Sequence, residues 1–139
     1  MKLAWPDPKE LGPILLGPVT RTDFVRYAGA SGDFNPLHHD AEFARAAGLP
    51  DVMAQGMYSA GLLASVLETW FGAGSLLRYS VRFRQPVWPD DRLTARCDRL
   101  TETSATTAEL SASLCRGATD VVLTATATIR KNPTGQETR

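Results

Sequence analysis

Apolar and polar residues alternate along much of the C-terminal half of the chain. Four runs, at residues 77–83, 93–97, 108–114 and 121–129, place an apolar or small side chain at every second position. A period of two is typical of a β-strand with one buried face. The intervening Pro89-Asp90-Asp91 and residues 117–120 are typical of turns. We therefore predict an antiparallel sheet whose buried face carries Leu77, Tyr79, Val81, Phe83, Leu93, Ala95, Cys97, Ala108, Leu110, Ala112, Leu114, Val121, Leu123, Ala125, Ala127 and Ile129.

The segment from Gly56 to Phe71 has a different pattern, because it is apolar or small on almost every side of a helix. A helix that is apolar all round is a buried helix. The segment is too short and too interrupted to span a bilayer, which takes about 20 apolar residues. We expect Ala60, Gly61 and Ala64 to let the sheet approach the helix closely. An antiparallel sheet wrapped around one buried helix is an α+β fold.

The first 19 residues contain four prolines, which favours an extended arm over a helix. Within this arm, the apolar residues 14–16 predict a short edge strand. Thr20 can cap a helix that has Asp23 as its third residue, and apolar residues at helical spacing extend this helix over residues 21–30. Gly32 then lets the chain turn away sharply.

A second short helix is predicted over residues 41–47, with Asp40 as its cap and Gly48 as its end. Phe43, Ala44 and Ala47 share one side of it, which we expect to face the core. Residues 132–139 have little to bury, so we expect a frayed tail.

The length and composition of the chain limit the kinds of fold and function that it can have. A chain of 139 residues fits one domain, residues 1–139, that can bury a core without disulfide or metal staples. Its 15 Lys and Arg residues balance 15 Asp and Glu residues, so no overall charge attracts nucleic acid or an anionic membrane. The start of the chain lacks the apolar stretch of a secretory signal, which predicts a cytoplasmic location. Cys97 and Cys115 lack metal-ligand spacing, and we expect them to be free structural thiols.

The residues from Asp33 to His38 combine an acid, an amide and an imidazole within six positions. Pro36 fixes its own φ and disfavours a helical Asn35, so these residues lie on an extended or turning loop. A carboxylate and an imidazole held close together can share one water and exchange protons with it. Asp33 and His38 are therefore candidate catalytic residues, and Asn35 is a candidate for orienting the loop or the water.

The same residues are also good turn formers, because Asp and Asn bond to their own backbone. Asn35 in particular can be a turn former and nothing else. His39, the second histidine of the chain, receives no role. Neighbouring histidines beside Asp33 and Asp40 lack the helical or hairpin spacing of a metal site, so we predict no bound metal.

Residues 32–38, Gly-Asp-Phe-Asn-Pro-Leu-His, resemble the signature of the MaoC-like hydratase family. This family includes the (R)-specific enoyl-thioester hydratases and the 3-hydroxyacyl-thioester dehydratases. The resemblance covers most of the chain, since it continues through Gly48-Leu49-Pro50, Ala54-Gln55-Gly56-Met57, Tyr79-Ser80-Val81-Arg82-Phe83, Pro86-Val87 and Pro89-Asp90-Asp91. It implies the hot-dog fold, in which an antiparallel sheet wraps around a central buried helix.

The resemblance also implies an activity, the reversible hydration of trans-2-enoyl thioesters of coenzyme A or acyl carrier protein to (R)-3-hydroxyacyl thioesters. Asp33 and His38 would carry the proton transfers, and the N–H of Gly56 would polarise the thioester carbonyl at the start of the buried helix. We expect Gln55, which stands where the family commonly has histidine, to contact the substrate together with Met57 and Tyr58. No cofactor is required.

Several alternatives stay open. A hot-dog thioesterase shares this fold and relies on a carboxylate of the buried helix, where Glu68 is the only acid and lies near the far end. The chain can also be a subunit that completes a partner's site. Ser59 and Ser65 either support the site or only pack. The row of Arg78, Arg82 and Arg84 either pairs with coenzyme phosphates or is solvated.

The edges of the predicted sheet indicate how copies of the chain assemble. Edge strands leave backbone N–H and C=O groups unpaired, and proteins pair or cover such edges. We therefore predict a homodimer with one continuous sheet and two active sites, with a dimer of dimers or a heteromer as the alternatives.

Overall fold

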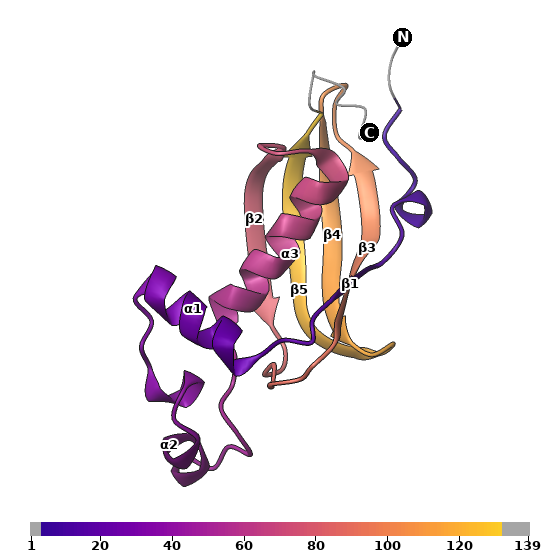
Figure 1. Ribbon diagram of the computed structural model, residues 1–139. Coiled ribbons are helices and arrows are strands. Elements are labelled where there is room, and N and C mark those ends of the chain that lie inside the picture. The colour runs from indigo at the N-terminus through magenta and orange to yellow at the C-terminus, as the bar shows by residue number, and fades with distance from the viewer. Residues whose placement is uncertain (1–3, 132–139) are drawn as a thin grey trace.

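The computed structural model describes residues 4–131. At its centre is an antiparallel sheet of five strands in the order β1-β3-β4-β5-β2. The strands are β1 (Ile14–Leu16), β2 (Leu76–Phe83), β3 (Leu93–Glu102), β4 (Thr107–Arg116) and β5 (Asp120–Arg130). Helix α3 (Gly56–Phe71) lies along one face of the sheet (Figure 1). This confirms the predicted α+β arrangement, including the short edge strand β1.

The other helical elements precede α3 in the chain. They are η1 (Pro8–Glu10), α1 (Arg21–Ser31), η2 (Pro36–His38) and α2 (Ala41–Ala46), where η denotes a 3₁₀ turn. Figure 1 shows α1 and α2 beyond the end of the sheet at which α3 begins. The predicted caps are confirmed: Thr20 and Asp23 form a reciprocal capping box, and the Asp40 side chain accepts a hydrogen bond from the Phe43 N–H at 3.0 Å.

The core lies between α3 and the face of the sheet that it covers. On β4 the buried positions alternate between alanine and leucine, and on β5 two alanines lie between Leu123 and Ile129. Each of these residues is no more than 4% exposed: Ala108, Leu110, Ala112, Leu114, Leu123, Ala125, Ala127 and Ile129. The alanines leave space for the helix, which buries Ala60, Leu63, Val66 and Leu67 in return. Close packing of this kind is what holds the helix in one position.

Helix α3 is buried on one side only, so the prediction that it is buried all round is wrong for the single chain. Met57 is 59% exposed, and Gly61 and Ser65 are exposed as well. A Cβ added to Gly61 would meet no atom within 4 Å, so this glycine does not face the sheet. The reason is geometric, because a single sheet can cover only one face of a helix.

Two strands depart from the predicted alternation because their register shifts. Between Leu76 and Arg78 the pairing with β5 slips, which leaves Leu77 53% exposed and packs Leu76 against the core. A second register shift, after Leu114 in the pairing of β4 with β5, buries Val122. The sequence pattern predicts its neighbour Val121 as the buried residue. A bulge changes which residues face inward, and periodicity alone does not reveal it.

Some residues at the periphery of the fold are also more exposed than predicted. Phe83, the last residue of β2, is 51% exposed, and Cys97 is half-buried. On α2 only Ala44 is buried, whereas Phe43 is 48% exposed and Ala47 is also exposed. The reason is that α2 packs beside η2 and not on the sheet, so it has little apolar surface to face.

Both cysteines are free, as predicted. Within residues 4–131 no helix is long and apolar enough to cross a membrane. The expected tail, residues 132–139, lies outside the described residues.

Tyr79 provides a test of the contact between sheet and helix. Its hydroxyl donates a hydrogen bond to the Ala60 carbonyl at 2.8 Å, and burial raises its pKa to about 12. We expect Tyr79→Phe to lower the free energy of unfolding by about 1 kcal/mol at neutral pH. Because the folded state favours the neutral phenol, this contribution is complete below the ordinary pKa of 10.0 and is lost as the pH rises towards 12.

Urea unfolding of the wild type and of Tyr79→Phe, at neutral pH and at about pH 11, measures this effect. The difference in unfolding free energy between the two proteins should shrink at the higher pH. A difference that stays constant would contradict the assignment.

Candidate active site

The Asp33–His38 segment is a chain of local turns. It leaves α1 through Gly32, whose φ of 77° ends the helix. The Asn35 side-chain oxygen accepts a hydrogen bond from the Leu37 N–H at 3.1 Å, and the Asn35 N–H donates to the Asp33 carboxylate at 3.3 Å. The turn thus uses the oxygen of Asn35, and only its NH₂ group is left for another partner.

His38 is 8% exposed and is held by a single backbone contact, with Nδ1 2.7 Å from the carbonyl oxygen of Met53. A carbonyl can only accept, so in the neutral ring Nδ1 carries the hydrogen and Nε2 is the basic nitrogen. Nε2 lies 3.6 Å from an oxygen of Asp33, whose side chain is 46% exposed. This separation is too long for a direct hydrogen bond and suits two groups that share a water.

Gly56 is the first residue of α3, and no described side chain caps this helix. Its N–H has no hydrogen-bond partner within residues 4–131. The start of a 16-residue helix concentrates partial positive charge, so this free donor favours an oxygen that gains negative charge. A Cβ on residue 56 would lie 3.1 Å from the Phe83 ring, so a larger residue would have to displace that ring.

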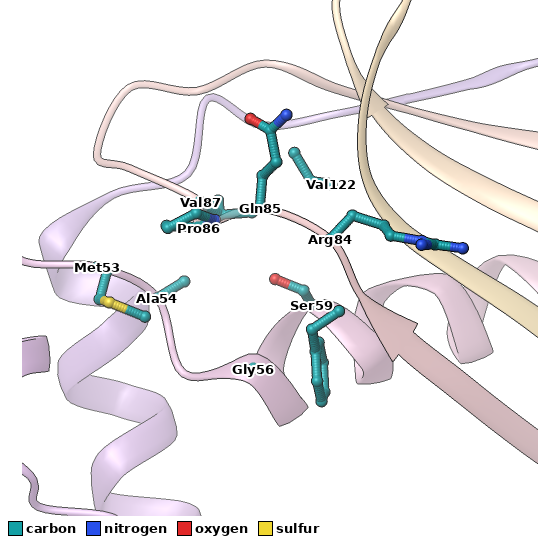
Figure 2. Close-up of a pocket in the computed structure, with 10 residues that line it drawn as sticks. Met53, Ala54, Gly56, Ser59, Arg84, Gln85, Pro86, Val87 and Val122 are labelled. Carbon is teal, nitrogen blue, oxygen red and sulfur yellow. The ribbon is translucent and has the colours of Figure 1, made fainter.

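A cavity of about 370 Å³ opens at the start of α3 (Figure 2). Its lining is mostly apolar and consists of Met53, Ala54, Gly56, Ser59, Phe83, Arg84, Gln85, Pro86, Val87 and Val122. Met53 also provides the carbonyl that holds His38, so the cavity and the Asp33–His38 pair are neighbours. Neither Asp33 nor His38 belongs to the lining itself.

The three residues expected to contact substrate beside Gly56 do not line this cavity. Gln55 is 1% exposed, and its amide donates to the Phe24 carbonyl at 2.9 Å, which ties the start of α3 to α1. The Tyr58 ring packs edge-on against Phe24, and Met57 points to the exposed side of the helix. Successive helical residues point in different directions, and it is Ser59, one turn after Gly56, that shares its face.

One wall of the cavity was not predicted as part of the site. It is formed by residues 84–87 together with Val122, whose carbonyl accepts hydrogen bonds from the N–H groups of Arg84 and Gln85 at 2.9 and 3.2 Å. The Ala54 N–H donates to the Val87 carbonyl at 2.9 Å and joins this wall to the segment before Gly56. The sequence does contain a signal, because Pro86-Val87 is part of the family resemblance.

The predicted row of arginines is divided. Arg84 belongs to the cavity lining, although Figure 2 shows its guanidinium pointing away from the cavity. Arg78 and Arg82 are exposed on β2. Among residues 4–131, no three His, Cys, Asp or Glu side chains are grouped so that they could hold a metal ion.

Arg116, at the end of β4, holds the cavity wall at residues 84–87 in place. Its guanidinium donates to the Pro86 carbonyl at 3.2 Å and to the carboxylates of Asp91 at 2.5 Å and Asp120 at 2.9 Å. It also lies 3.4 Å from the side-chain oxygen of Gln85. One side chain therefore connects two turns with the segment that lines the cavity.

The solved structures similar to this chain include an (R)-hydratase from A. caviae involved in PHA biosynthesis, with a TM-score of 0.75 and 27% identity, over 87% of this chain and 95% of that one. R-Hydratase PhaJ1 from Pseudomonas aeruginosa is also similar, with a TM-score of 0.78 and 24% identity, over 86% and 78% of the two chains. The sheet and its central helix thus define a hot-dog fold.

A family model described as MaoC like domain matches residues 13–113, and the chain belongs to this family. Among curated relatives, 3-hydroxyacyl-thioester dehydratase X of Mycobacterium tuberculosis is 38% identical over 80 residues, 58% of this chain and 28% of that protein. The (R)-specific enoyl-CoA hydratase of Rhodospirillum rubrum is 34% identical over 79 residues, 55% of either protein. The match thus spans only part of the length of these relatives.

We predict that Arg116→Gln lowers the free energy of unfolding by about 2 kcal/mol, because it removes charge-assisted hydrogen bonds and leaves Asp91 without its cation. Arg82→Gln, at an exposed position on β2, is the matched control and should change stability by less than about 0.5 kcal/mol. Urea denaturation of the three proteins measures both effects. Equal stability of the two variants would contradict the role of Arg116.

Proposed function

We propose that the chain catalyses the reversible hydration of trans-2-enoyl thioesters to (R)-3-hydroxyacyl thioesters. The observation that carries this proposal is the Asp33–His38 pair, whose Oδ2 and Nε2 atoms lie 3.6 Å apart. The pair lies next to an apolar cavity at the uncapped N-terminus of α3. Membership of the MaoC-like family supports it, as do the names of the dehydratase and hydratase relatives.

The proposed reaction adds one water across the C2=C3 double bond. A water about 2.8 Å from both Nε2 of His38 and Oδ2 of Asp33 can hydrogen-bond to each of them. One group of the pair accepts a proton from the water as its oxygen bonds to C3, and C2 receives a proton from the pair, which returns to its starting state. Since both groups act from the same side of the substrate, the addition is syn.

Negative charge develops on the thioester oxygen as the water adds. The N–H of Gly56 can donate to this oxygen, and the α3 dipole reinforces the bond. The apolar walls at Met53, Ala54 and Val87 suit an acyl chain, since ligand cavities are mostly apolar with a few polar groups that fix orientation. This part of the mechanism uses main-chain donors and needs no cofactor.

Hydrolysis of the thioester is the main alternative. It would rely on Glu68, which lies 12 residues after Gly56 and hence about 18 Å along the helix. The Glu68 carboxylate accepts a hydrogen bond from the Gly74 N–H at 3.1 Å at the far end of α3. This position favours a structural role, so we place hydration ahead of hydrolysis.

The thioester carrier and the assembly are part of the proposal. Both enoyl-CoA and acyl-carrier-protein thioesters occur in the names of the relatives. We propose a homodimer joined through β2, because β2 is an edge strand that exposes Leu77 and Phe83. A heteromer is the alternative, since similar solved structures include the ChsH1-ChsH2 complex from Mycobacterium tuberculosis.

We predict that Asp33→Asn and His38→Ala each reduce kcat/KM for hydration of crotonyl-coenzyme A by at least about 100-fold, because each variant removes one of the two proton-transfer groups. His39→Ala is the matched control: it removes the adjacent exposed histidine and should stay within about threefold of the wild type. Loss of the enoyl absorbance measures hydration, and a thiol reagent measures hydrolysis. Hydration at the wild-type rate by Asp33→Asn or His38→Ala would show that the assignment of these two residues is wrong. Release of free thiol from the substrate would favour the thioesterase alternative.

The assembly is tested by sedimentation velocity on the purified chain at micromolar concentration. We expect a dimer, because pairing of β2 with its copy would satisfy its free backbone groups. A monomer with full hydratase activity would rule out the proposed interface.

A further inference from the structure

Besides Tyr58, three residues of α3 carry a hydroxyl, Ser59, Ser65 and Thr69, and Ser59 differs from the other two. Ser65 donates to the Gly61 carbonyl at 3.0 Å, and Thr69 donates to the Ser65 carbonyl at 2.9 Å. This bond to the carbonyl four residues back is the ordinary one for a hydroxyl within a helix. Ser59 lacks it: within residues 4–131 its hydroxyl has no hydrogen-bond partner, although the residue is only 4% exposed.

The Ser59 hydroxyl instead reaches the cavity. Ser59 belongs to the cavity lining, and Figure 2 shows its oxygen pointing into the space between Ala54 and the segment that carries Pro86 and Val87. Side chains on a helix lean towards its N-terminus and cover the preceding turn. The hydroxyl of Ser59 therefore lies over the first turn of α3, on the side where Gly56 also faces the cavity.

The Ser59 hydroxyl has no protein partner in the described part of the chain, and a ligand that fills the cavity displaces the water that can reach it. A ligand atom that replaces this hydrogen bond therefore binds better than one that cannot. Only a polar atom can do so, and the cavity is otherwise mostly apolar. The ligand therefore has to bring one hydrogen-bonding atom to the first turn of α3 and apolar atoms to the walls. A thioester carbonyl attached to an acyl chain meets both requirements.

We propose that Ser59 is a second hydrogen-bond donor to the thioester oxygen, beside the N–H of Gly56. This inference rests on the proposed function and adds a side chain to the contact with the thioester oxygen, which otherwise consists of the Gly56 N–H. Ser59 keeps its proton throughout, because it forms a hydrogen bond and no covalent bond. The bond strengthens as the oxygen becomes enolate-like, so it acts on kcat more than on KM.

The first experiment is steady-state hydration of crotonyl-coenzyme A by Ser59→Ala, Ser59→Thr and Ser65→Ala. We expect Ser59→Ala to lower kcat by about 10- to 100-fold with KM changed less than about threefold. Ser59→Thr keeps the hydroxyl and should be several-fold more active than Ser59→Ala. Ser65→Ala removes a serine from the same helix that bonds to its own backbone, and it should stay within about twofold of the wild type.

The second experiment needs no turnover. Butanoyl-coenzyme A labelled with ¹³C at its carbonyl is saturated and cannot be hydrated, and its infrared carbonyl band moves to lower frequency when the oxygen accepts hydrogen bonds. We expect a clear shift on the wild type and on Ser65→Ala and a smaller one on Ser59→Ala. Equal shifts on Ser59→Ala and the wild type, or no binding to the wild type, would overturn the inference.

The two experiments separate the two proposals. If Asp33→Asn and His38→Ala abolish hydration while Ser59→Ala retains at least half of the wild-type kcat, the role of Ser59 is wrong and the hydratase stands. If the wild type does not hydrate crotonyl-coenzyme A but its carbonyl shift depends on Ser59, the contact stands and hydration is wrong. Equal loss in Ser59→Ala and Ser59→Thr would also count against the hydroxyl, with thermal unfolding as the check that both variants are folded.

Discussion

The packing of α3 against the face of the sheet at β2 and β5 is the constraint on which the rest of the molecule depends. Ala125 and Ala127 of β5 are small enough for the helix to lie close to the sheet, and Leu63 and Leu67 fill the remaining space. Once the helix is held in this way, its first residue must lie beside the end of β2. The cavity forms at that point, between the start of the helix and the residues that follow the strand.

The start of α3 differs from the starts of the other helical elements. Asp7, Thr20, Asn35 and Asp40 each cap a helical element with a side chain, whereas α3 has no side-chain cap. Caps of this kind contribute about 1 kcal/mol each, so leaving the longest helix uncapped has a cost in stability. The free N–H groups at this N-terminus are available to a ligand oxygen, as proposed for the thioester carbonyl.

A few backbone contacts bring together residues that are far apart in the chain. The Met53 carbonyl fixes the ring of His38, and one residue later the Ala54 N–H holds the wall at Val87. Arg116 then fixes that wall from the opposite side through the Pro86 carbonyl. The loop with the acid and imidazole, the start of α3 and the wall of the cavity are therefore linked through the short segment before Gly56.

Local patterns in the sequence determined much of this protein: the α+β class, the ends of α1 and α3, the edge strand β1 and the turn that brings Asp33 near His38. Each depends on neighbours in the chain, such as a cap, a proline or a period of two. Other features depend on contacts between distant segments, so only the tertiary structure decided them. The bulge that exposes Leu77 comes from pairing with β5, and the wall at residues 84–87 depends on Val122. The free hydroxyl of Ser59 likewise reflects what lies opposite it, because sequence spacing cannot show whether a helical serine faces backbone, core or cavity.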